Sequence, residues 1–170
     1  MDRRYPIGIF TFQRVYPQEQ LLAWVKEFPL FPEKLSQEVT KLTATQLEKQ
    51  YRPDSWTVRQ LVHHLADSHI NSYTRFRLAL TEDNPIVRTY EEGKWAELTD
   101  AQNGPIDVSL QLLEAIHTRW ANLATSLSEE DWKRTWQHPE SGEGTLADMM
   151  GLYVWHSNHH FSHIQLAIQG

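Results

Sequence analysis

The chain of 170 residues contains no cysteine, and this absence removes several kinds of chemistry at once. Disulfide bonds, thiolate metal ligands and a cysteine nucleophile are all excluded. Any sulfur that takes part in a reaction must therefore come from a cosubstrate.

Long apolar runs and an excess of basic residues are also missing. No segment approaches about 18 consecutive apolar residues, so we expect no membrane span. No apolar stretch follows Arg3-Arg4, so we expect no secretion signal and place the protein in the cytoplasm. The net charge is −6, and the 16 Lys and Arg residues are scattered singly, which argues against nucleic acid as a partner. We expect a small-molecule substrate instead.

Apolar residues recur at helical spacing over almost the whole chain. The pattern predicts long helices over residues 17–42, 57–80, 106–127 and 145–168, with no convincing strand. Pro29 and Pro32 are expected to kink or interrupt the first helix. Helices of this length predict an all-α fold, an antiparallel four-helix bundle. A chain of this size fits one domain, residues 1–170, with residues 1–16 as an extended N-terminal arm.

Local signals mark where helices begin and where the chain leaves the bundle. Four short motifs are typical of capping boxes, in which two side chains satisfy the first backbone N–H groups of a helix. They are Thr43-x-x-Gln46, Thr57-x-x-Gln60, Ser128-x-x-Asp131 and Thr145-x-x-Asp148. Residues 81–105 form a long connection between the second and third helices, and such segments are usually functional or contain a short element. Residues 94–98 could supply one helical turn.

Two clusters contain seven of the nine histidines. The first is His63-His64-Leu65-Ala66-Asp67-Ser68-His69, and the second is Trp155-His156-Ser157-Asn158-His159-His160-Phe161-Ser162-His163. Imidazole is well suited to hold a transition metal at neutral pH. The pairs His156/His160 and His159/His163 have i, i+4 spacing, which places each pair on one helical face within reach of a single ion.

Helical projection separates the histidines of the fourth helix. His156 and His160 fall inside the edge of the apolar face, whereas His159 and His163 lie on its flank. Two histidines on an apolar face are expensive to bury without partners, and a metal ion supplies that partner. A lone histidine there is more often a hydrogen-bonded core residue. Because a pair faces a second cluster on a neighbouring helix, we favour a metal site.

The second helix leaves the third ligand open. His69 projects toward the apolar centre and His64 lies on the border, so spacing alone does not choose between them. His63 projects to the polar side, and we expect it, like His138, at the surface. Asp67 lies one turn from the His63-His64 pair and is the candidate catalytic residue, as a general base or a partner of the ligands. An ordinary solvated carboxylate is the alternative.

The first histidine cluster belongs to a longer stretch that resembles a known family. The stretch Ser55-Trp56-Thr57-Val58-Arg59-Gln60-Leu61-Val62-His63-His64-Leu65-Ala66-Asp67-Ser68-His69, followed by Gly151-Leu152-Tyr153-Val154-Trp155-His156, resembles the YfiT-type branch of the DinB-like proteins. The likeness covers nearly the whole chain, from Tyr5-Pro6-Ile7-Gly8 to the C-terminal histidines. It implies a four-helix bundle, metal-dependent hydrolase activity and a homodimer.

The resemblance also implies the ligand set. The family's three-histidine site corresponds to the second histidine of the His63-His64 pair, the histidine after Trp155 and the histidine four residues later. These are His64, His156 and His160. The chain departs from close relatives at Asn158, where another histidine is expected. Because Asn158 projects to the polar side of its helix, we expect the site to survive this change.

A zinc ion bound by three neutral imidazoles, with its fourth coordination position open, is typical of a catalytic site rather than a structural one. We expect one divalent ion per chain, zinc first and nickel second. Such an ion lowers the pKa of bound water from ~15.7 to about 7, so hydroxide becomes available for hydrolysis. Two alternatives stay open: transfer of a thiol cosubstrate held as thiolate, as relatives do with bacillithiol or mycothiol, and a non-catalytic ion that only ties the helices together. The sequence does not identify the substrate.

Overall fold

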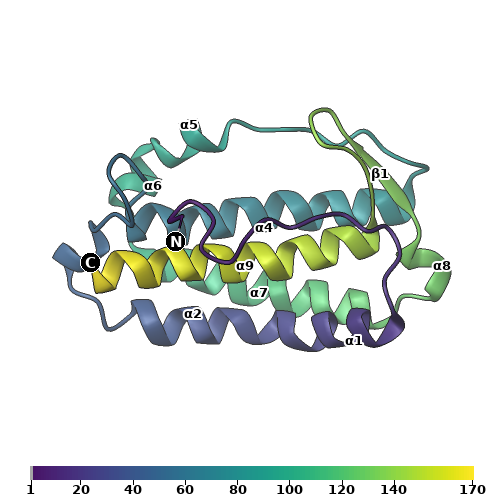
Figure 1. The fold of residues 1–170 in the computed structure, drawn as a ribbon, viewed down its shortest axis with the longest axis horizontal. Coiled ribbons are helices and arrows are strands. Elements are labelled where there is room, and N and C mark those ends of the chain that lie inside the picture. Colours follow the sequence, from purple (N-terminus) through teal and green to yellow (C-terminus); the bar gives the residue numbers. More distant parts are fainter. Residues whose placement is uncertain (1) are drawn as a thin grey trace.

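Four long helical segments build the fold and follow the predicted order along the chain (Figure 1). The computed structural model describes residues 2–170. The segments are α1 (Gln18–Glu27) continued through η1 (Phe28–Leu30) into α2 (Phe31–Val39), α4 (Val58–Thr81), α7 (Ile106–Thr125) and α9 (Leu146–Gln169). The predicted four-helix bundle with a long connection between its second and third helices is therefore confirmed.

Two prolines interrupt the first segment as predicted. Pro29 lies in the first turn of η1 and Pro32 in the first turn of α2. Proline has no backbone N–H and cannot continue the hydrogen-bond ladder of a preceding helix, although it is tolerated in a first turn. The segment is therefore divided at residues 28–30 while its direction is kept.

All four predicted capping boxes form. In each one the Ser or Thr hydroxyl accepts a hydrogen bond from the backbone N–H three residues later, and the Gln or Asp side chain accepts one from the N-cap N–H. The boxes begin α3 (Ala44–Leu47), α4, α8 (Glu129–Trp132) and α9. Because α4 and α9 carry the histidine clusters, these local signals fix where both histidine-bearing helices begin.

The prediction that neighbouring helices all run antiparallel is wrong for α4 and α7. His69 contacts His117 and Phe76 contacts Trp120, so residue numbers rise together along both helices. The cause is the connection over residues 82–105, which carries the chain back along the bundle before α7 begins (Figure 1). A crossover of this kind lets two consecutive long helices run parallel.

The connection between α4 and α7 contains α5 (Glu92–Ala96) and α6 (Thr99–Asn103), which confirms the expected helical turn. The prediction of no strand is wrong, because β1 (Thr135–His138) and β2 (Gly142–Thr145) pair as an antiparallel hairpin. Each strand has only four residues, too few to show clear alternation. Gly144 lies opposite Trp136, where a Cβ atom would approach the indole to 2.8 Å, so glycine is required there.

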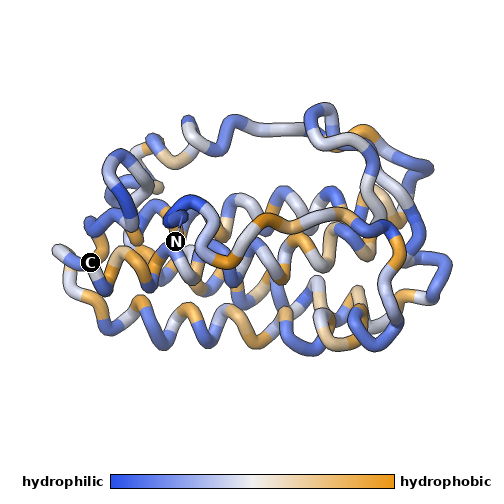
Figure 2. Tube along the Cα trace, in the orientation of Figure 1, coloured by the Kyte–Doolittle hydropathy of each residue, from blue (hydrophilic) through white to orange (hydrophobic). Residues whose placement is uncertain are grey.

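The interior consists of two apolar clusters, and polar residues lie between them. One contains Leu61, Leu65 and Ile164, and the other contains Phe76 and Met149. Figure 2 shows hydrophobic residues recurring along all the long helices. Between the clusters, α4 has the buried residues Ser68, His69 and Ser72, and α9 has Ser157, His159 and His160. Within residues 2–170, no helix is both long and apolar enough to cross a membrane.

Asp148, in the first turn of α9, holds the N-terminal arm onto the bundle. The Tyr16 hydroxyl and the backbone N–H groups of Gln13 and Arg14 donate to its Oδ1, while Thr145 donates to Oδ2. Burial raises the pKa of this carboxyl, but the hydrogen bonds from Tyr16, Thr145 and Arg14 lower it more, and the net value lies below the usual one. The carboxylate is therefore stabilised in its charged form.

We expect Asp148→Ala to lower the free energy of unfolding by about 1.5–3 kcal/mol, because buried donors lose a charged acceptor. Urea denaturation measures the loss. Asp131→Ala is the matched control, since Asp131 occupies the same capping-box position in α8 without contacts to the arm. The stabilisation should be present at neutral pH and disappear as the pH falls through the lowered pKa of Asp148. Equal losses in both variants would contradict this role.

Candidate metal centre

His64 of α4 and His156 and His160 of α9 meet where the two helices pack together. One ring nitrogen from each of them lies within 4.8 Å of the other two. His64 and His160 are buried, whereas His156 keeps partial exposure. The structure thus brings together the three residues predicted as ligands.

The closest pair of ring nitrogens has the spacing of ligands around a small ion. The Nε2 atoms of His64 and His156 are 3.3 Å apart. Zinc–nitrogen bonds of about 2.0–2.1 Å in tetrahedral geometry place neighbouring ligand nitrogens about 3.3–3.4 Å from each other. Two lone pairs that face each other at this distance repel unless a proton or a cation lies between them. This donor set therefore fits a tetrahedral divalent ion.

Burial keeps the three rings in the neutral form that binds metals. Burial, with a smaller contribution from the neighbouring His159, lowers the pKa of His64 to about 4. Burial also lowers the pKa of His156 and His160 well below the usual value, with smaller contributions from the surrounding histidines. At neutral pH all three imidazoles carry a free lone pair, as metal binding requires.

A second histidine group shares one residue with the first. Ring nitrogens of His159, His160 and His163 also lie within 4.8 Å of one another, and all three residues are buried. His163 stacks on Tyr51 with ring centroids 3.9 Å apart, and His159 stacks on Trp155 at 4.4 Å. Because His160 belongs to both groups, spacing alone does not tell which one holds an ion.

His69 lies at the apolar centre as predicted, with no exposed surface. Its ring contacts His156 and His117 and is not a member of either three-histidine group. The sequence interpretation overlooked His117 of α7, which is also fully buried. Its position in the apolar stripe with Leu113 and Trp120 is the signal that could have revealed it.

The prediction that His63 lies at the surface is wrong. The ring is buried, with Nδ1 2.8 Å from the Ser109 hydroxyl and Nε2 3.3 Å from the Gly104 carbonyl oxygen. The side of α4 that looks polar in projection is covered by α6 and the start of α7, which arrive through the crossover. His138 is partly exposed, and its Nδ1 accepts hydrogen bonds from the N–H groups of Glu140 and Ser141 in the hairpin turn.

Asp67 lies one helical turn after His64 and is half-buried. Burial raises the pKa of its carboxyl to about 6, and the negative charge of Asp100 contributes in the same direction. The carboxyl therefore changes protonation close to neutral pH, unlike an ordinary solvated aspartate. A carboxyl with a raised pKa, one helical turn from a candidate metal ligand, is a candidate functional residue.

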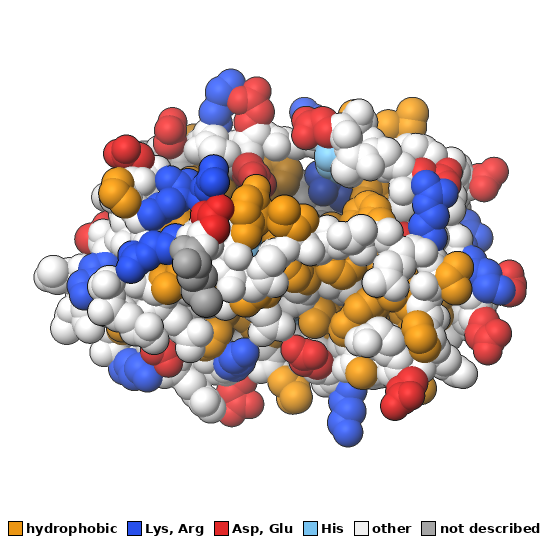
Figure 3. Space-filling model, viewed as in Figure 1, with side chains coloured by type: hydrophobic (Ala, Val, Ile, Leu, Met, Phe, Trp, Pro, Cys, Tyr) orange, Lys and Arg blue, Asp and Glu red, His pale blue; other side chains and the backbone are white. Residues whose placement is uncertain are grey.

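The surface is hollowed over α4, between the crossover segment and the N-terminal arm (Figure 3). Hydrophobic side chains lie around this hollow, and basic and acidic side chains also lie at its edge. This depression lies over α4, the helix that carries His64 and Asp67.

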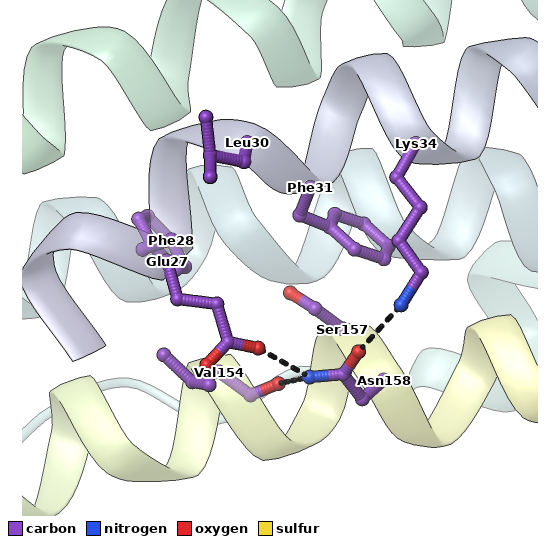
Figure 4. A pocket seen from close by; sticks show the side chains of 8 residues that line it. All are labelled: Glu27, Phe28, Leu30, Phe31, Lys34, Val154, Ser157 and Asn158. Carbon is purple, nitrogen blue, oxygen red and sulfur yellow. Dashed lines mark hydrogen bonds between the residues drawn. The ribbon is translucent and has the colours of Figure 1, made fainter. Parts of the chain in front are cut away.

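Asn158 points from α9 toward the α1–α2 segment (Figure 4). Its amide group donates to Glu27 and to the Val154 carbonyl and accepts from Lys34, each at 3.1 Å. These residues line a pocket of about 220 Å³ between α9 and the α1–α2 segment. Asn158 therefore has its own partners and does not take part in the His64, His156 and His160 group.

Comparison with known proteins places these features in a family. The model of the DinB superfamily matches residues 28–164. Proteins named "Putative metal-dependent hydrolase" are similar to the chain over 163 residues, 96% of its length and 94% of theirs: one from Bacillus cereus is 51% identical and one from Bacillus anthracis is 50% identical. The solved structure of YfiT from Bacillus subtilis, described as a probable metal-dependent hydrolase with an unusual four-helix bundle topology, is 43% identical, with a TM-score of 0.96 over 99% of this chain and 98% of that one.

Proposed function

The chain belongs to the DinB superfamily, and from this membership and its converging imidazoles we propose that it is a metal-dependent hydrolase with His64, His156 and His160 as ligands. The observation that carries the proposal is the 3.3 Å separation of the Nε2 atoms of His64 and His156, with a ring nitrogen of His160 within 4.8 Å of both residues' ligand nitrogens. The names of the relatives support the same reaction class.

We propose zinc rather than nickel as the resident ion. The spacing of the His64 and His156 nitrogens fits tetrahedral coordination, whereas octahedral ligands at ordinary distances lie closer together. A divalent ion with three protein ligands lowers the pKa of the water it binds to about 7 and so supplies hydroxide at neutral pH. The chain's own residues must then position the substrate and accept the proton.

Asp67 has the properties of the proton acceptor. Its carboxyl is half-buried beside the ligand helix face, and its pKa of about 6 makes it ionised, yet basic enough to take a proton, at pH 7. The hydrophobic side chains beside the hollow suit an acyl substrate with an apolar group, because such a group displaces water from apolar surface when it binds.

Hydrolysis by the metal-loaded protein tests the proposal. A panel of p-nitrophenyl and thiophenyl esters is offered to the protein as purified, after treatment with a chelator, and after zinc is restored. We expect ester cleavage that disappears with the metal and returns with zinc. His138→Ala, which removes a histidine outside the site, should behave like the wild type, and His156→Ala should be inactive.

The same assay separates the alternatives. Two results together would favour thiol transfer over hydrolysis. The ester assay would give product only when a low-molecular-weight thiol is added, and the thiol would form a conjugate with a monohalobimane faster than it does without the protein. A protein that binds zinc, unfolds when the zinc is removed and cleaves nothing in the panel would replace catalysis by a structural role.

A further inference from the structure

Three histidines outside the proposed ligand set link two of the ligands to backbone carbonyl groups. The first chain begins at His156, whose Nδ1 lies 3.3 Å from Nε2 of His69. Nδ1 of His69 lies 2.8 Å from Nε2 of His117, and Nδ1 of His117 lies 2.7 Å from the carbonyl oxygen of Phe28. No ring nitrogen of His69 or His117 is left without a partner.

The carbonyl at the end of this chain determines where every proton lies. A carbonyl oxygen only accepts, so Nδ1 of His117 must carry the proton that it donates to Phe28. In a neutral ring Nε2 is then an acceptor, and burial lowers the pKa of His117 to about 4, which keeps the ring neutral. His69 must therefore donate from Nδ1 to His117 and accept at Nε2 from Nδ1 of His156. Nε2 of His156 is left with a free lone pair, directed to His64.

The Phe28 carbonyl is available because of a proline. In a continuous α-helix this oxygen would accept from the backbone N–H four residues later, but that residue is Pro32, which has none. The N–H of Phe31 occupies only part of its accepting capacity. The Phe28 ring also stacks on His117 with centroids 3.9 Å apart and holds the imidazole in place.

A second, shorter chain has the same form. Nδ1 of His160 lies 3.3 Å from Nδ1 of His163, and Nε2 of His163 lies 3.3 Å from the carbonyl oxygen of Arg4. His163 must donate to this carbonyl from Nε2 and accept at Nδ1 from His160. Nε2 of His160 is then free to bind a metal. Its Nδ1 carries a proton, so this nitrogen cannot bind a metal together with His159 and His163.

We propose that His69, His117 and His163 are positioning residues, which fix the tautomers of His156 and His160 so that both present an unprotonated Nε2 to one ion. This inference rests on the metal site proposed above. It also selects the group with His64 over the group with His159 and His163. Partners that fix the tautomer and orientation of a ligating histidine are commonly carboxylates, backbone carbonyls or water, whereas here other histidines carry the link to the carbonyl.

Nuclear magnetic resonance of the metal-free, ¹⁵N-labelled protein tests the proton positions directly. Long-range ¹H–¹⁵N correlations distinguish the two neutral tautomers of each ring. We expect Nδ1–H in His69, His117, His156 and His160, and Nε2–H in His163. An Nε2–H tautomer at His69 or His117 would overturn the first chain, and an Nδ1–H tautomer at His163 would overturn the second. This readout needs no variant, no metal and no activity.

Zinc affinity gives a second readout that a purely structural role would not reproduce. In titrations against a chromogenic chelator, His69→Leu should bind zinc about 10–100-fold more weakly than the wild type. His69→Gln should recover most of the affinity, because a carboxamide can accept from His156 and donate to His117. His63→Leu is the matched control: it removes a buried, hydrogen-bonded histidine from the same helix, outside both chains, and should leave the affinity unchanged.

The outcomes separate this inference from the proposed function. If the wild type binds zinc at His64, His156 and His160 but His69→Leu binds it equally well, the positioning role is wrong and the proposed function stands. If the wild type binds no zinc there, the proposed function is wrong, and the tautomers of the metal-free protein still decide whether the two chains exist. Should His69→Leu not fold, as judged by circular dichroism, the tautomer measurement on the wild type decides alone.

Discussion

Replacing His64 with alanine is expected to remove nearly all bound metal from the purified protein, whereas replacing His159 with alanine leaves about one equivalent in place. Each residue belongs to only one of the two histidine groups, since His160 alone is shared. Four-ligand zinc sites bind with about 10–16 kcal/mol, so the loss of one ligand costs about 3 kcal/mol, or roughly a hundredfold in affinity. Elemental analysis after gel filtration measures the metal content.

Two further variants complete this comparison. His156→Ala should behave like His64→Ala, and His138→Ala should keep the metal, because His138 lies in the hairpin and outside both groups. Circular dichroism and thermal unfolding of the metal-free forms verify that each variant folds. Full metal content in His64→Ala, together with loss in His159→Ala, would place the ion in the other group and contradict the proposed ligand set.

Replacing Asp67 with asparagine is expected to lower kcat about 10²–10⁴-fold, the usual contribution of a general base. The side chain keeps its size and loses the ability to accept a proton. Because Asp67 acts when deprotonated and its pKa is about 6, the wild-type rate should rise with pH through about 6 and level off above it. Steady-state kinetics from pH 5 to 8 should show that this acidic limb is absent from the variant.

The variant Asp100→Asn tests whether the acidic limb reports the Asp67 carboxyl or another group that ionises near pH 6. The charge of Asp100 helps to raise the pKa of Asp67, so its removal should shift the acidic limb to lower pH and leave the plateau rate close to that of the wild type. Metal content should be unchanged in both variants. Two results would exclude Asp67 as the base: an acidic limb of the pH–rate profile that lies at the same pH in Asp100→Asn as in the wild type, or an Asp67→Asn variant of normal activity.

The features that depend on local sequence could be predicted. Capping boxes at Thr57 and Thr145 are complete within four residues, and the proline interruption at residues 28–32 follows from a missing N–H. The apolar face of α9 was also readable, which is why His156 and His160 were recognised as a pair. Each of these features depends on residues that are close in the sequence, so a short stretch of sequence is enough to predict it.

The features that depend on how distant segments pack could not be predicted in this way. His63 looked exposed because its covering, α6 and the start of α7, comes from the far end of a crossover. The parallel course of α4 and α7 has the same origin. The choice between His64 and His69 depends on ring positions across three helices. His64 faces Nε2 of His156, whereas His69 lies between Nδ1 of His156 and His117. The four-residue strands were too short for a periodic signal.

The central claim is that one divalent cation lies between two helices, held by imidazoles, with room for a reacting molecule. A crystal structure of the zinc-loaded protein, with anomalous difference maps collected on both sides of the zinc absorption edge, tests it most directly. We predict one peak per chain, about 2.0–2.1 Å from Nε2 of His64, His156 and His160, with the fourth position held by solvent. A peak among His159, His160 and His163, or a fourth ligand supplied by the protein, would contradict it.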